Sequence, residues 1–155
     1  MDVRFLCDSN LGKLSKWLRI LGYNTLFDRG KADQCFILKA GQEGRIALTR
    51  KRMLGGDSGR LIVVTADRVE GQISEVMEAL CIKPDPKDRM TLCLRCNAKL
   101  KAAAKADVEG IVPVYVYQNC TDFRKCPDCG RIYWPGTHPR RVEEYLRTRI
   151  PIRLL

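Results

Sequence analysis

The sequence lacks the features that mark membrane-spanning and exported proteins. Its apolar runs fall well short of the roughly 20 consecutive residues that a transmembrane helix requires, so we expect no contact with a membrane. The first ten residues, MDVRFLCDSN, contain an early acidic residue and no basic region followed by a long apolar stretch, unlike a signal peptide. Internal repeats and low-complexity tracts are also missing. We therefore expect a cytoplasmic protein.

Acidic residues are few relative to basic ones. The 155 residues include 28 Lys and Arg against 18 Asp and Glu, a net charge of +10. Because neutralising phosphates releases condensed counterions, this imbalance favours a polyanionic partner, and RNA is the leading candidate. The alternative is that the excess charge is only a solvated surface.

Histidine is almost absent. The single one, His138, lies in the turn-like stretch YWPGTHP, where it is either a general acid or base, a phosphate contact, or a local hydrogen-bonding residue. Tyr133 and Trp134 of the same stretch either stack on bases or pack over the neighbouring cysteine module.

Residues 1–83 alternate between short apolar runs and helical periods, which predicts an α/β domain with a parallel sheet. Residues 84–90 hold two prolines and alternating charges, and we interpret them as a linker. Residues 91–155 are predicted to form a zinc ribbon with a basic C-terminal helix that starts near residue 139. Within the ribbon, the stretch VPVYVYQ at 112–118 predicts a strand.

Half of the eight cysteines form two Cys-x-x-Cys pairs. Four thiolates at this spacing suit tetrahedral Zn²⁺, and a closed thiolate site is structural and does not activate water. Asn97 and Gly130 follow the second cysteine of each pair, where a left-handed backbone closes the turn. The predicted zinc ligands are Cys93, Cys96, Cys126 and Cys129. The isolated cysteines, predicted to be buried thiols, are Cys7, Cys35, Cys81 and Cys120.

Charged residues follow two of the predicted strands. Asp8 comes directly after the first strand, where it either projects into the ligand crevice of an α/β sheet or caps the helix that starts near Leu11. Cations follow the third strand and recur on the first helix, and together they predict one groove for a phosphate backbone. The alternative is a solvated helix face. The predicted nucleic-acid-binding residues are Lys13, Lys16, Arg19, Arg50, Lys51 and Arg52.

The segments FLCDSNLGKLSKWLRILGYNT, LTRKRML, CLRCN and CPDCGRIYWPGTH together resemble the Mut7-C RNase domain family. The resemblance runs from Phe5 to about Arg141. It implies a PIN-like Rossmannoid parallel sheet with a C-terminal zinc ribbon. It also implies an acidic cluster that binds Mg²⁺ or Mn²⁺ and cleaves RNA, because two such ions about 4 Å apart activate water and stabilise the leaving oxygen of a phosphodiester.

The same resemblance implies which carboxylates bind metal. Asp8 matches the aspartate that follows the first strand, and Asp33 matches the acidic residues that open the second helix, although Asp33 is equally placed to interact with the helix dipole. Where the family typically has Thr-Arg-Asp after the third strand, this chain has Thr49-Arg50-Lys51. An ammonium there repels Mg²⁺ and can pair with Asp8 or Asp33. The candidate replacement carboxylates are Asp57 and Asp67.

Two functions therefore remain open. One is an RNA-binding metal-dependent endoribonuclease, a hydrolase whose catalytic residues are Asp8, Asp33 and Asp67, with Arg50 and Lys51 on the phosphate. The other is a catalytically inactive module, in which the charge of Lys51 replaces that of the metal. Such a module binds RNA, or it binds a protein or the ribosome through its zinc ribbon or basic tail.

Overall fold

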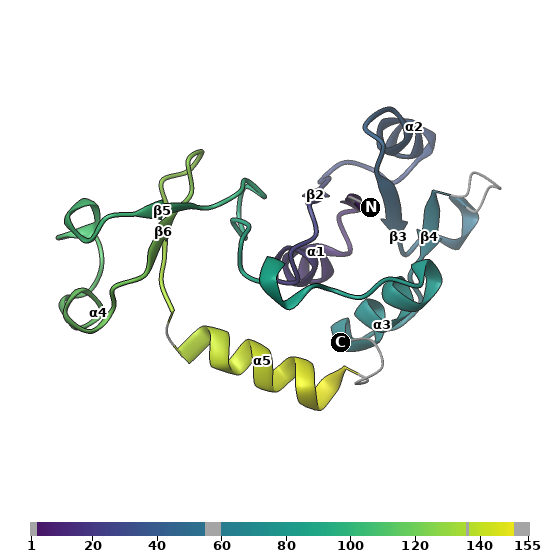
Figure 1. Cartoon of the computed structure of the whole chain (residues 1–155). Coiled ribbons are helices and arrows are strands. Elements are labelled where there is room, and N and C mark those ends of the chain that lie inside the picture. Colours follow the sequence, from purple (N-terminus) through teal and green to yellow (C-terminus); the bar gives the residue numbers. More distant parts are fainter. Residues whose placement is uncertain (1–2, 55–59, 136, 151–155) are drawn as a thin grey trace.

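The first half of the chain forms a four-stranded parallel sheet, as the sequence predicts (Figure 1). The structure is a computed structural model that describes residues 3–54, 60–135 and 137–150. In spatial order the strands are β2 (Thr25–Phe27), β1 (Phe5–Cys7), β3 (Ile46–Thr49) and β4 (Leu61–Val63). From β1 the chain moves outward to β2, and from β3 it moves the opposite way to β4. The strand order therefore reverses between β1 and β3, and ligands of such sheets bind at the carboxyl ends of the strands at this point.

Helices cover both faces of this sheet because its strand residues alternate in direction. Phe5 and Cys7 belong to the core shared with the first and third helices, whereas Leu6 packs with Phe36 and Ala40 of the second helix on the other face. None of the described helices is long and apolar enough to cross a membrane. The helices are α1 (Gly12–Ile20), α2 (Gln34–Gln42) and α3 (Val69–Leu80).

The second sheet is antiparallel and carries the cysteine pairs. Its strands are β5 (Lys101–Ala103), β6 (Phe123–Lys125) and β7 (Ile132–Tyr133), in that spatial order. The predicted strand at 112–118 is wrong, because this stretch forms the helix α4 (Val114–Asn119). Val112 and Val116, four residues apart, both pack on the ribbon core, while Val114 and Tyr115 are exposed. Pro113 at the N-cap suits a helix start.

The C-terminal helix α5 (Thr137–Arg149) lies against the α/β unit and closes its core. Leu146 and Ile150 are buried in the same cluster as Leu14 and Leu18. The Tyr145 ring stacks on Trp17 of α1, with 4.5 Å between centroids. Figure 1 shows α5 running from the ribbon back toward α3. The sequence places this helix with the ribbon at 91–155, but its apolar face is buried against residues of the first 83.

The segment at 84–90, interpreted as a linker, is fixed against the end of α1. It forms a 3-10 helix over Pro86–Asp88, and the backbone N–H of Met90 donates to the Ile20 carbonyl at 2.9 Å. Gly22 has a φ of +96°, and a Cβ at this position would lie 2.6 Å from the Asp88 carbonyl oxygen. Only glycine meets both requirements without distortion.

We therefore expect Gly22→Ala to lower the free energy of unfolding by about 1–3 kcal/mol, through backbone strain and the clash with Asp88. Gly41→Ala is the matched control, because a Cβ at Gly41 meets nothing within 4 Å and its helical position favours alanine. Urea denaturation of the full chain measures both variants. Equal stability of the two would contradict this account of the close approach.

Candidate nucleic-acid interface and metal centre

Asp8 lies where the strand order reverses, and its carboxylate joins the ends of β1 and β3. The side chain is fully buried. Its Oδ1 accepts the Asn10 N–H at 2.8 Å, and its Oδ2 accepts the Thr49 hydroxyl at 2.6 Å and the Arg50 N–H at 3.3 Å. Sequence reasoning missed Thr49 as a member of the site, although its place at the end of a buried strand is the signal that marks it.

Lys51 makes a different contact from the one expected. Its Nζ donates to the Ala32 carbonyl at 3.0 Å, next to the start of α2. Among the described residues, no ion pair joins Lys51 to Asp8 or Asp33. Asp33 is exposed and caps α2 by accepting the Phe36 N–H at 3.2 Å. Its carboxylate therefore interacts with the start of its own helix, which is the alternative to the metal-ligand role.

The carboxylate of Asp67 forms an ion pair with Arg50. Its Oδ1 accepts from Nη2 of Arg50 at 2.8 Å, and its side chain is 92% exposed. An exposed ion pair of this kind contributes about 1 kcal/mol at most to stability. Asp67 is therefore linked to the end of β3 by its ion pair with Arg50. It does not belong to the hydrogen-bonded group around the buried carboxylate of Asp8.

The carboxylates predicted to bind Mg²⁺ or Mn²⁺ do not form one cluster. Within residues 3–54, 60–135 and 137–150, the only group of three or more metal-ligating side chains is that of the four paired cysteines. Asp57 lies outside the described residues, as does the side chain of His138. Because the oxygens of Asp8, Asp33 and Asp67 do not come together in one group, this arrangement does not fit a two-ion carboxylate site.

A cavity of about 560 Å³ opens beside these strand ends, and we call it the cationic groove. Lys13 and Arg50 line it as predicted, and sequence reasoning missed Arg68 and Arg149. Arg149 reaches the groove because α5 packs back onto the α/β unit. The complete lining is Asn10, Lys13, Arg50, Asp67, Arg68, Val69, Glu70, Gln72, Tyr145 and Arg149.

The expectation that Arg19 shares an exposed face with Lys13 and Lys16 is corrected by the structure. Each step of three residues turns an α-helix by about 300°, which is about 60° short of a full turn. After two such steps, Arg19 lies about 120° around the helix from Lys13. Arg19 is buried, and its guanidinium binds backbone carbonyls. Lys16 is exposed on α1 and Arg52 is exposed after β3, and both lie outside the groove lining described above.

The four paired cysteines come together in one group that could hold a metal ion. One Sγ atom from each of Cys93, Cys96, Cys126 and Cys129 lies within 4.8 Å of the others. Asn97 and Gly130 have φ values of 66° and 69°, which confirms the predicted left-handed residues after each pair. Four sulfurs at the turns of a small antiparallel sheet fit a structural Zn²⁺, and these residues would hold it.

The surroundings of these four thiols favour ionisation of one of them, Cys93. Burial opposes ionisation of Cys93, but hydrogen bonds from the Tyr133 hydroxyl and the backbone N–H of Cys96 outweigh it and lower its pKa to about 6. The hydrogen bond between Cys96 and Cys129 raises the pKa of Cys96 to about 12. A divalent cation lets all four ionise together. Tyr133 thus belongs to the cysteine module, the second of its two sequence interpretations.

The isolated cysteines differ from one another. Cys7 is buried in the main core, and its burial raises its pKa above the ordinary range. Cys35 and Cys81 are exposed, and Cys120 is partly buried, so the prediction of buried thiols is wrong for these positions. Cys81 ends α3 with a φ of 51°, which places it at the surface after the last apolar turn.

The first cysteine turn is docked on the edge strand β2. The Asn97 Oδ1 accepts the Thr25 N–H at 2.8 Å, and its Nδ2 donates to the Asn24 Oδ1 at 2.9 Å. Arg19 donates from Nε to the Thr25 carbonyl at 2.8 Å and from Nη1 to the Leu94 carbonyl at 2.7 Å. The metal site therefore covers part of a sheet edge whose backbone groups would otherwise be unpaired.

A family model described as the Mut7-C RNAse domain matches residues 3–146. The chain belongs to the Mut7-C RNAse domain family. No curated protein and no solved structure matches it. The matched range includes the parallel sheet, the cysteine module and most of α5, all of which contribute to the groove or hold it in place.

Membership of the Mut7-C family indicates a ribonuclease-like function, which fits a groove at the carboxyl ends of a parallel sheet. Thr49, Arg50 and Lys51 follow one another from the end of β3, and each of the three has a described contact. Thr49 holds Asp8, Arg50 binds Asp67, and Lys51 binds the Ala32 carbonyl.

Because Asn97 accepts the Thr25 N–H, removing metal from the full chain should expose that amide. We expect its hydrogen exchange to accelerate at least about tenfold on chelation, since losing the cysteine site unfolds the turn that carries Asn97. The Asp8 amide is the internal control, because it donates to the Leu48 carbonyl within the sheet. Unchanged exchange at Thr25 after verified metal loss would show that the docking does not depend on the metal.

Proposed function

We propose that this protein binds single-stranded RNA in the cationic groove. The observation that carries the proposal is the convergence of cations from separate elements on one cavity. Lys13 comes from α1, Arg68 from the N-cap of α3 and Arg149 from the last turn of α5. Bringing like charges together is unfavourable unless a polyanion neutralises them, and the family indicates which polyanion.

The groove keeps a net positive charge, because four cations line it against two carboxylates. Glu70 accepts the Tyr145 hydroxyl at 2.8 Å, and hydrogen bonds from its own backbone and from Tyr145 lower its pKa, so it is ionised at neutral pH. Asp67 is held by Arg50 alone among the groove cations. Since that exposed pair is weak, an RNA phosphate can replace Asp67 on the Arg50 guanidinium.

The charge of Lys51 supports RNA binding that does not depend on a metal ion held by carboxylates. Its ammonium occupies the position at which the family typically has a third carboxylate, and it lies beside the start of α2 where Asp33 caps the helix. A fixed positive charge there attracts phosphate and opposes the capture of a divalent cation. Lys51 lies outside the lining of the cationic groove, so in this proposal it acts on RNA through its charge alone.

Metal-dependent RNA cleavage is the second candidate function. It is favoured by family membership and by Asp8, which is placed where the strand order reverses. Protein or ribosome binding through the cysteine module remains a proposal of a different class, supported by the exposed Ile111, Val114 and Tyr115 on that module.

RNA affinity should fall with salt, with a slope of about −2 for three phosphates neutralised on a single strand. Lys13→Glu combined with Arg68→Glu should weaken binding at least about tenfold and reduce that slope. Lys16→Glu is the matched control, because it lies on the same helix outside the groove lining. Fluorescence anisotropy with a labelled single-stranded RNA measures all three proteins. Affinity that is independent of salt, or equal loss in the control, would contradict the proposal.

Cleavage assays with Mn²⁺ separate the two main candidates. We expect the natural sequence to cleave no more single-stranded RNA than Asp8→Asn does, since its carboxylates are not clustered. Lys51→Asp should bind Mn²⁺ more tightly than the natural sequence in calorimetry, because it removes the ammonium and adds a carboxylate beside Asp33. Mn²⁺-dependent cleavage that Asp8→Asn abolishes would establish the enzyme instead.

A further inference from the structure

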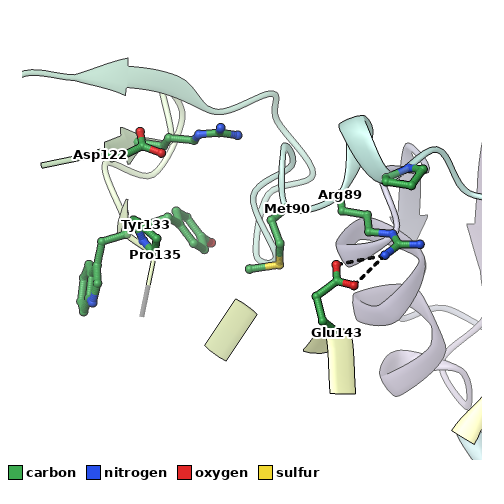
Figure 2. A pocket seen from close by; sticks show the side chains of 9 residues that line it. Arg89, Met90, Asp122, Tyr133, Pro135 and Glu143 are labelled. Atoms are coloured by element: carbon green, nitrogen blue, oxygen red, sulfur yellow. Dashed lines mark hydrogen bonds and ion pairs between the residues drawn. The ribbon is translucent and has the colours of Figure 1, made fainter. Parts of the chain in front are cut away.

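A second cavity, of about 250 Å³, lies where the segment at 84–90, the cysteine module and α5 meet (Figure 2). Its lining residues are Pro86, Arg89, Met90, Asp122, Arg124, Tyr133, Trp134, Pro135 and Glu143. It is separate from the cationic groove, because the two share no lining residue and because Glu143 and the groove residue Tyr145 project about 160° apart around α5.

Arg89 forms one wall of this cavity through its ion pair with Glu143. Its Nη1 donates to both carboxylate oxygens of Glu143, at 2.9 and 3.0 Å, which Figure 2 shows as dashed lines. Its Nε is buried and is the one buried side-chain nitrogen or oxygen without a partner among the described residues. Because this nitrogen is closed to solvent, the Arg89–Glu143 pair bounds the cavity without offering it the Nε donor.

Met90 presents an apolar side chain to the same cavity from a strained backbone. Its φ of 58° is unusual for a residue with a side chain. In Figure 2, Met90 lies between Arg89 and Glu143 on one side and Tyr133 and Pro135 on the other. Strain at such positions persists where the surrounding structure fixes it, and it is concentrated at ligand sites.

We propose that this cavity binds one unpaired nucleobase of RNA. Met90 and the aromatic residues Tyr133 and Trp134 supply apolar surface for the face of the base. The exposed Asp122 carboxylate accepts from an amino group of the base.

The size and position of the cavity define the ligand further. Its volume is below the roughly 300–1,000 Å³ of sites for drug-sized ligands, which favours a single base over a base pair. Arg124 at the rim is placed to neutralise the adjoining phosphate. The proposal rests on the RNA-binding function above, and it adds a preference for bases that are free of a duplex.

Tryptophan fluorescence provides the test, since the chain has two tryptophans. In Trp17→Phe, which keeps a ring for Tyr145 to stack on, Trp134 is the only one left. We expect saturable quenching by a single-stranded RNA hexamer that contains all four bases, and affinity about tenfold weaker for the abasic hexamer. Met90→Gly removes the apolar side chain from the cavity and suits the φ of 58°, and it should abolish the difference between the two hexamers. Arg131→Lys, exposed on the same module, should preserve it.

Asp122→Tyr also tests base binding in the cavity, and because Asp122 is exposed we expect this variant to fold normally. It should fill the cavity mouth and also abolish the preference for the intact hexamer. Equal binding of both hexamers by the Trp17→Phe protein would overturn the cavity proposal and leave groove binding intact. If neither hexamer binds, the RNA-binding function fails, and titration with the four nucleoside 5′-monophosphates decides the cavity. Saturable quenching of Trp134 by any of them would support the base site, and none would overturn it.

Discussion

The buried guanidinium of Arg19 joins the two halves of this protein. Burial lowers its pKa, and a charge removed from water needs compensating partners. The partners are the carbonyl of Thr25 on the edge strand and those of Leu94 and Arg95 in the first cysteine turn. Folding of α1 therefore creates a buried cation whose partners come both from β2 and from the docked cysteine turn. That docking fixes where the ribbon lies and hence where α5 begins.

The return of α5 gives the molecule its two proposed RNA contacts. One face of the helix places Tyr145 and Arg149 in the cationic groove, and another places Glu143 at the smaller cavity. Leu146 and Ile150 anchor the helix in the core of the α/β unit. Because the helix is continuous with the cysteine module, metal binding, core packing and both surfaces form one connected system.

The buried carboxylate of Asp8 has a structural role that does not require catalysis. It ties β1 to β3 through Thr49 and the Arg50 backbone, so losing it would leave buried donors unpaired. The side chain of Lys51, two residues after Thr49, binds the Ala32 carbonyl instead of this carboxylate.

The sequence by itself determined the features that depend on local spacing. Apolar periodicity predicted the parallel sheet, and cysteine spacing predicted the cysteine cluster with its left-handed residues Asn97 and Gly130. Only the tertiary structure decided that Arg19 turns inward, that 112–118 is helical, and that α5 completes the groove. Each of these depends on contacts between residues far apart in the chain, and local spacing carries no information about such contacts.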